Sequence, residues 1–389
     1  MHRSDKRILT THVGSLPRNA VLTDLLIRDE AGEAVDRTEL RRQSESAVRY
    51  VVEQQTASGV DIVNDGEQPR VGFQTYVAQR MKGFGGESKR PRPRDYMDFP
   101  GLAAQLPQRY PRRSKVSNAP QAIADVRYED LAPAEEECRM FRAALDKLPS
   151  SPVESFMTAA SPGIIATTLL NAHYDSHEAY VFALAHEMRK EYELIARHFM
   201  LQIDAPDLAL ERTVLFQDKS VAEFLKVAET HVAALNEALA GIPRERIRLH
   251  CCWGNYDGPH IHDIPLREVL PVLYQAKVGA LSIEFANPRH QHEYAALKKA
   301  KLPPEFLLLP GVIDSKTNFV EHPEVVANRI CEAVDAVGDR SRVIASIDCG
   351  FGTFAGSELV AEDVVWAKLK TCREGAELAT RRLWGQVRS

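Results

Sequence analysis

The residues of this 389-residue chain that could carry chemistry stand at the ends of short apolar segments. Five segments end in a carboxylate, a histidine or a cysteine: Asp61–Glu67, Leu201–Asp204, Arg248–Cys252, Leu281–Glu284 and Ala345–Gly350. Burying a charged or thiol group without a partner costs free energy, so packing alone does not explain why such groups follow apolar segments. We therefore expect these segment ends to meet in one reactive site.

Four of these side chains form a donor set for a metal ion. His250 and Cys252 are two residues apart on a predicted strand, so they point to one face and Cys251 to the other. Cys349 ends a second strand and Glu284 a third. One imidazole, two thiolates and one carboxylate suit a tetrahedral zinc ion. The sequence predicts zinc at His250, Cys252, Glu284 and Cys349, with the metal activating a sulfur nucleophile.

The other reactive residues are expected to have structural roles. Six cysteines in a chain of this length are no disulfide framework. We expect buried thiols at Cys138, Cys251, Cys331 and Cys372, and a packing or pocket-wall residue at Trp253. We expect loop residues rather than ligands at His260, His262, His290 and His292.

Eight apolar, β-branched segments alternate with helical periodicity, which is typical of β/α units and a parallel sheet. The predicted strands are Ile8–Ser15, Asp61–Glu67, Val153–Ser161, Phe199–Asp204, Arg246–Cys252, Ala280–Phe285, Phe306–Asp314 and Val343–Cys349. The predicted helices include Glu39–Ala57, Glu178–His198, Val221–Leu239, Pro323–Val337 and Glu362–Leu383. This count predicts a (β/α)8 TIM barrel over residues 1–389, a fold whose active sites lie at the carboxyl ends of the strands. A doubly wound sheet is the alternative, but no G-x-G-x-x-G follows the first strand.

A Pro/Arg-rich stretch over residues 83–134 interrupts this rhythm between the second and third strands. Its clustered arginines are Arg90, Arg92, Arg94, Arg109, Arg112 and Arg113. We expect an insertion that reaches over the strand ends as a lid and recognises an anionic donor. The alternative is a solvated loop or an oligomer contact.

The bulk composition excludes several classes of protein. A net charge of −5 argues against a nucleic-acid partner. No apolar run approaches the roughly 20 residues that span a bilayer, and the first residues lack the apolar core of a signal peptide. We expect a cytoplasmic enzyme with small-molecule substrates and no membrane partner. A homo-oligomer is compatible with the sequence, which does not determine the oligomeric state.

Six motifs occur in the order in which they stand in a known family. They are the turn Thr11–Arg18, Asp65-Gly66-Glu67, Gln202-Ile203-Asp204, His250–Cys252, Ile283-Glu284 and Asp348-Cys349-Gly350. With these motifs the chain resembles the catalytic barrel of cobalamin-independent methionine synthase, whose relatives include the epoxyalkane:coenzyme M transferases.

The resemblance implies a function and a set of site residues. It implies zinc at His250, Cys252, Glu284 and Cys349, and transfer of a methyl or alkyl group to a substrate thiol. It also implies that Ser15 helps to hold an amino-acid carboxylate and that Glu67 and Asp204 hold its ammonium group. The family's acceptor is of the homocysteine type and its donor of the 5-methyltetrahydrofolate type.

The chain departs from the family's pattern on the donor side. Residues 160–171 contain no tryptophan to stack on a folate ring, and Ala205-Pro206 replaces a Glu-Pro. Asp314-Ser315-Lys316 stands where the family has Asp-x-His. Two alternatives therefore stay open: a thiol alkylase with another donor, as in coenzyme M addition to an epoxide, and a zinc-binding barrel without catalysis. Coenzyme M has no amine, so Glu67 and Asp204 favour an amino thiol.

Overall fold

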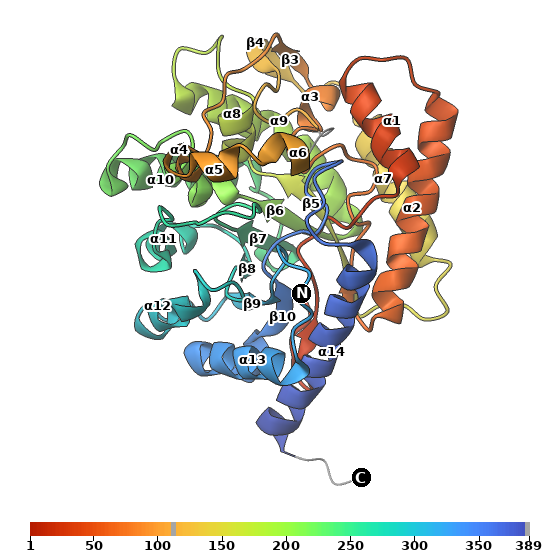
Figure 1. Cartoon of the computed structure of the whole chain (residues 1–389), viewed down its shortest axis with the longest axis vertical. Helices are drawn as coiled ribbons and strands as arrows, with labels where there is room; N and C mark the ends of the chain where they lie inside the picture. The colour runs from red at the N-terminus through yellow and green to blue at the C-terminus, as the bar shows by residue number, and fades with distance from the viewer. Residues whose placement is uncertain (110–113, 386–389) are drawn as a thin grey trace.

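The chain folds around one eight-stranded parallel sheet (Figure 1). The structure is a computed structural model that describes residues 1–109 and 114–385. The strand order is β1-β10-β9-β8-β7-β6-β5-β2. These strands are β1 (Leu9–Thr10), β2 (Ile62–Val63), β5 (Glu154–Ala160), β6 (Met200–Asp204), β7 (Ile247–Cys251), β8 (Ala280–Ile283), β9 (Leu307–Ile313) and β10 (Ile344–Ile347). Each lies within one of the eight predicted strand segments.

The two edge strands, β1 and β2, meet and nearly close the sheet into a barrel. Each of these two strands has only two residues. They are joined by individual hydrogen bonds from residues next to the strands rather than by a continuous strand pairing. The Asp61 backbone N–H donates to the Thr10 carbonyl at 3.2 Å, and the Thr11 hydroxyl donates to the Ile62 carbonyl at 3.1 Å. This closure confirms the (β/α)8 barrel and excludes the doubly wound sheet, which has two open edges.

Helices surround the barrel, and their starts and ends follow the sequence. Ser220 caps the helix after β6 in a capping box with Glu223, and Gly338 ends the helix after β9 with a left-handed φ of 79°. The helices are α1 (Ala20–Glu30), α2 (Arg37–Ala57), α7 (Ala132–Leu145), α8 (Pro162–Thr168), α9 (His177–His198), α10 (Val221–Ala238), α11 (Leu266–Leu273), α12 (Tyr294–Lys299), α13 (Pro323–Val337) and α14 (Glu362–Trp384). The five predicted helices match α2, α9, α10, α13 and α14 to within two residues at each end.

Apolar side chains from the strands fill the barrel interior and form a small core of their own. This core consists of Leu9, Ile62, Phe156, Met200, Ala280, Leu307, Leu309 and Ile344. A larger core packs the outside of the sheet against the helices. Because the interior is filled in this way, the carboxyl ends of the strands are the place for a binding site.

The predicted insertion between the second and third barrel strands consists of short elements. They are α3 (Val77–Arg80), β3 (Lys82–Gly85), α4 (Arg94–Asp98), α5 (Pro100–Ala103), α6 (Leu106–Arg109) and β4 (Gln121–Arg127). β3 and β4 pair as a two-stranded antiparallel sheet, and α4 to α6, which lie between them in the sequence, are in front of the barrel sheet in Figure 1. The predicted range of 83–134 overlaps the first residues of the barrel helix α7, and Arg112 and Arg113 lie outside the described residues.

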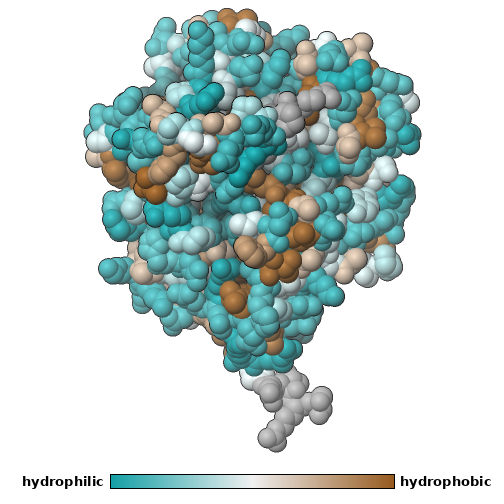
Figure 2. Space-filling model, viewed as in Figure 1, coloured by the Kyte–Doolittle hydropathy of each residue, from teal (hydrophilic) through white to brown (hydrophobic). Residues whose placement is uncertain are grey.

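The outer surface carries no sign of a membrane segment in the part of the chain that the structure describes. No helix there is long and apolar enough to cross a bilayer. The face shown in Figure 2 is mostly hydrophilic, with small hydrophobic patches near its middle.

Candidate active site

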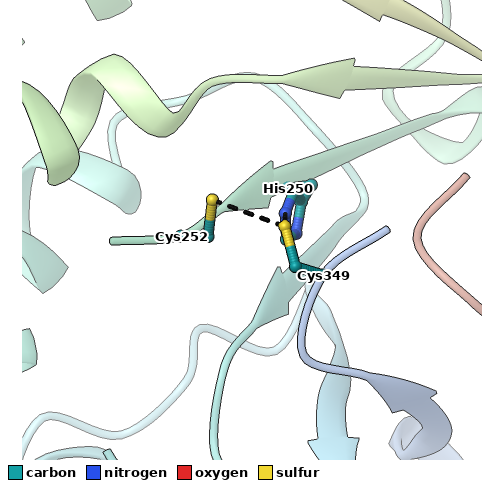
Figure 3. A group of neighbouring side chains, drawn as sticks. All are labelled: His250, Cys252 and Cys349. Atoms are coloured by element: carbon teal, nitrogen blue, oxygen red, sulfur yellow. Dashed lines mark hydrogen bonds between the residues drawn. The ribbon is translucent and has the colours of Figure 1, made fainter. Parts of the chain in front are cut away.

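Three of the four predicted metal ligands meet at the carboxyl ends of the strands (Figure 3). His250 lies on β7, Cys252 follows that strand directly, and Cys349 comes two residues after β10. The Cys349 sulfur lies 3.7 Å from His250 Nε2 and 3.9 Å from the Cys252 sulfur. All three side chains are buried, and their donor atoms lie within 4.8 Å of one another.

The residues on either side of Cys349 explain how it reaches this position. The Asp348 carboxylate accepts the backbone N–H groups of Phe285, Ala286 and Asn287 at 2.8–2.9 Å, which ties the end of β10 to the loop after β8. At position 350 a Cβ would stand 2.0 Å from the Ser15 hydroxyl oxygen, so glycine is required there. In this Asp-Cys-Gly motif, Asp348 anchors the end of the strand, Cys349 belongs to the metal group and Gly350 leaves room for Ser15.

The lowered pKa of the Cys349 thiol favours a thiolate that can bind a metal cation. The Cys252 thiol is hydrogen-bonded to the Cys349 sulfur, and this contact, helped by His250, lowers the pKa of Cys349 to about 5. The same contact, together with burial, raises the pKa of Cys252. Two sulfurs and one imidazole nitrogen at these separations are the donor chemistry that zinc prefers, and the residues present therefore fit a zinc ion.

Glu284, the fourth predicted ligand, does not belong to this group in the described part of the chain. Its carboxylate accepts a hydrogen bond from the Lys316 ammonium group at 2.8 Å, from Asn287 Nδ2 at 2.8 Å and from the Trp253 backbone N–H at 3.1 Å. Burial favours the neutral acid, but the Lys316 charge outweighs it and lowers the pKa of Glu284 below its ordinary value. The structure thus places Glu284 beside the group, paired with a lysine.

A cavity of about 440 Å³ opens directly above the three residues. Its walls include Ser15, Glu67 and Asp204, the three residues that the family resemblance assigns to an amino acid. Burial, with repulsion from Asp204, raises the pKa of Glu67 to about 8. Burial also raises the pKa of Asp204 to about 6. The structure therefore brings six of the seven predicted site residues around one cavity, and Glu284 lies behind its wall.

Glu67 is held by its neighbours with one carboxylate oxygen left free. Its Oε1 accepts the Thr158 hydroxyl at 2.9 Å, while the buried Oε2 has no hydrogen-bond partner. Arg70 donates to the same Thr158 oxygen at 3.1 Å, so the hydroxyl proton points to Glu67. Glu67 has a left-handed φ of 54°, and the Arg18 guanidinium group holds its backbone carbonyl at 2.7 Å. A strained backbone of this kind persists only where the surroundings enforce it.

The insertion forms the outer wall of the cavity, as expected for a lid. Pro91, Arg92, Tyr96 and Leu106 line it together with Cys252 and Cys349 from the strand ends. The clustered arginines, however, are largely engaged with carboxylates. Arg90 forms an ion pair with Glu211, Arg94 with Asp98 and Arg109 with Asp257, whereas Arg92 is exposed at the cavity.

Of the four cysteines expected to be buried thiols, Cys138, Cys251 and Cys372 are buried, whereas the prediction is wrong for Cys331, which is only partly buried at the edge of the large core. Cys251 lies in the large core, and Trp253 is fully buried, stacked on His290 at 3.9 Å. His260 and His290 both contact Asp263 and take no part in the metal group. The contacts of Arg70, Thr158 and Lys316 with the site residues could not be predicted from the sequence. Arg70 stands three residues after Glu67, but no spacing pattern pointed to Thr158.

The fold is a (β/α)8 barrel, and a His/Cys/Cys group and two buried carboxylates line one cavity at the carboxyl ends of its strands, where enzymes of this fold have their active sites. Residues 112–374 match the family described as cobalamin-independent synthase, catalytic domain. The chain belongs to this family of methyltransferases, the cobalamin-independent methionine synthases.

The similarity to known proteins covers nearly the whole chain. A methionine synthase of Saccharolobus solfataricus is 26% identical over 96% of this chain and 95% of its own length. A methionine synthase of Sulfurisphaera tokodaii is 23% identical over 96% of this chain and 93% of its own. The structure of a vitamin-B12-independent methionine synthase from a Shewanella species, in complex with selenomethionine, superposes with a TM-score of 0.73. That likeness covers 97% of this chain and 99% of the other at 20% identity, and it shows the fold.

Proposed function

We propose that this protein is a zinc-dependent methyltransferase that methylates the thiol of homocysteine. One observation carries the proposal: the two buried carboxylates, Glu67 and Asp204, line the same cavity as His250, Cys252 and Cys349. A thiol-activating group and an ammonium-binding pair suit the two ends of an amino thiol. The barrel and the lid act as one catalytic unit in this proposal.

The three residues His250, Cys252 and Cys349 would hold the zinc ion. Bound zinc lowers the pKa of a thiol, so that sulfur is available as a thiolate near neutral pH. The methyl transfer then forms a sulfur–carbon bond while the bond between methyl and donor breaks, and the electron pair of that bond leaves with the donor. Because the cavity opens onto all three residues, the arrangement favours catalysis over a closed structural zinc site.

The carboxylate pair binds and orients the amine. Glu67 and Asp204 repel each other in a buried place, and an ammonium group between them would relieve this repulsion. The free Oε2 of Glu67 is the acceptor for that group. Ser15, next to Gly350 and Cys349, lies where it can donate to the amino-acid carboxylate. In this proposal Glu67 and Asp204 bind the amine of the thiol substrate, and Ser15 binds its carboxylate.

The donor side of the cavity suits a flat molecule. Phe73 and Phe354 line it with ring centroids 5.8 Å apart, and Tyr96 adds a third aromatic face from the lid. These rings are candidates to replace the tryptophan that the family places after its third strand. We include a donor of the 5-methyltetrahydrofolate type in the proposal, because aromatic side chains can stack on its flat ring system.

The test combines a product assay with a binding comparison. Zinc-loaded protein with methyltetrahydrofolate and a panel of thiols should convert homocysteine to methionine, detected by mass spectrometry. Glu67→Gln should weaken homocysteine binding about 30- to 100-fold, or about 2–3 kcal/mol, because a charge-assisted hydrogen bond is lost. Binding of 4-mercaptobutanoate, which lacks only the amine, should change less than about threefold. Equal losses for both thiols would show that Glu67 does not bind the amine.

A further inference from the structure

Lys316 is a buried cation next to the metal group, in the segment where this chain departs from its family. It follows β9 in Asp314-Ser315-Lys316. Its ammonium group donates to Glu284 Oε2 at 2.8 Å, and the two side chains are only 9% and 1% exposed. Lys316 and Glu284 therefore form a desolvated ion pair beside His250, Cys252 and Cys349.

The Glu284 carboxylate accepts two further hydrogen bonds. Its Oε1 accepts the backbone N–H of Trp253, the residue that follows the ligand Cys252, at 3.1 Å. Its Oε2 accepts Asn287 Nδ2 at 2.8 Å in addition to Lys316. Each oxygen thus accepts at least one hydrogen bond, from donors in three different segments, and a metal would have to compete with these contacts.

We infer that Lys316 keeps Glu284 out of the coordination sphere, so that the zinc ion is held by three protein side chains and substrate sulfur enters an open fourth position. This inference rests on the proposed function. It differs from the four-ligand set that the family resemblance implies, and it identifies Lys316 as a positioning residue for this chain.

The surroundings of Lys316 oppose a switch of Glu284 to the metal. Such a switch would leave a buried ammonium group without its carboxylate and the Trp253 backbone N–H without its acceptor. The nearby Asp348 cannot take over, because its two oxygens already accept three backbone N–H groups and Asn287 Nδ2. The ion pair is therefore the arrangement that gives both Lys316 and Glu284 a partner of opposite charge.

The three-ligand arrangement has a chemical consequence. Two thiolates would balance the two positive charges of a zinc ion, and Lys316 balances Glu284, so these groups together would carry no net charge before the acceptor binds. The sulfur of the acceptor would then have no protein side chain to displace. An open position of this kind is the property of catalytic rather than structural zinc sites.

The experiment compares zinc affinity, by competition with a chelator, and the visible absorption of the cobalt(II)-substituted protein. The variants are Glu284→Gln, Lys316→Met, the double variant of both, and Cys349→Ser as the ligand control. We expect Glu284→Gln to retain one zinc per chain with affinity within about tenfold of wild type, whereas Cys349→Ser loses at least about 100-fold. Lys316→Met should free the carboxylate, raise zinc affinity and shift the cobalt absorption bands.

The outcomes separate this inference from the proposed function. Loss of zinc in Glu284→Gln to the extent seen in Cys349→Ser would overturn the inference, because Glu284 would then be a ligand. Should Lys316→Met fail to fold, the double variant decides: wild-type zinc affinity supports the inference, and a loss like that of Cys349→Ser refutes it. A wild-type protein that binds no zinc, or a Cys349→Ser variant that binds it normally, would instead overturn the proposed function.

Discussion

Glu67 at the end of β2 and Glu284 at the end of β8 are the same residue type at equivalent ends of the same barrel, and both are buried. Their environments nevertheless have opposite effects. Burial and the neighbouring Asp204 raise the pKa of Glu67 to about 8, while Lys316 lowers the pKa of Glu284 in spite of its burial. One carboxylate oxygen of Glu67 has no partner, whereas both oxygens of Glu284 accept hydrogen bonds.

The difference lies in whether the protein itself supplies a cation to the buried carboxylate. Arg70 lies near Glu67, but its guanidinium group is committed to Glu137 and to Thr158. Glu67 is therefore left with an unmet need for a cation, which a substrate ammonium group can supply. Glu284 already has its cation within the protein, so it can shape the site without binding substrate.

The largest effect should come from breaking the ion pair of Glu284. In zinc-free protein at pH 8, Lys316→Met should lower the free energy of unfolding by about 3–5 kcal/mol, because a buried charge loses its partner. Urea unfolding measures this change, and the double variant Glu284→Gln/Lys316→Met should recover most of it. As a control, Lys298→Met removes the exposed pair with Asp335 and should have no measurable effect. A loss below about 1 kcal/mol for Lys316→Met would mean that the pair is dispensable.

An intermediate effect should appear in the pH dependence of stability. The pKa of Glu67 is raised in the folded protein, so the folded state binds more protons than the unfolded state, and stability falls as the pH rises towards about 8. Glu67→Gln should remove this fall and be more stable than wild type at pH 9 by about 2 kcal/mol, measured on zinc-free protein without substrate. Glu284 has the opposite sign, since its lowered pKa gives stability that is lost only in acid. A Glu67→Gln variant no more stable than wild type at pH 9 would contradict the raised pKa.

The smallest effect should come from the residue that positions Glu67. Thr158→Val keeps the shape of the side chain but removes the hydroxyl that donates to Glu67 Oε1. Homocysteine affinity should fall about fivefold, or about 1 kcal/mol, while zinc content and 4-mercaptobutanoate binding stay unchanged. Thr167→Val is the matched control, because that buried hydroxyl donates to backbone carbonyls of α8. Equal effects of the two substitutions on homocysteine would argue against a positioning role for Thr158.

The fold and much of the site could be predicted because they follow from local rules. Alternating strands and helices indicated the barrel, and the i, i+2 spacing placed His250 and Cys252 on one face with Cys251 on the other. The role of the lid arginines was less predictable. Arg90 is tied to Glu211, a residue 121 positions away, and no periodicity in the sequence connects the two.

The sequence by itself determined which residues stand at the carboxyl ends of the strands, since parallel strands in a barrel bring those ends together whatever their order in the chain. Only the tertiary structure decided what each end residue does there. Thr158 is 91 positions from Glu67 and Lys316 is 32 positions from Glu284, yet Glu67 receives a neutral hydroxyl donor and Glu284 a cation. The physical reason is that a carboxylate's role depends on charges and donors within about 4 Å, and in a barrel those come from neighbouring strands rather than neighbouring residues.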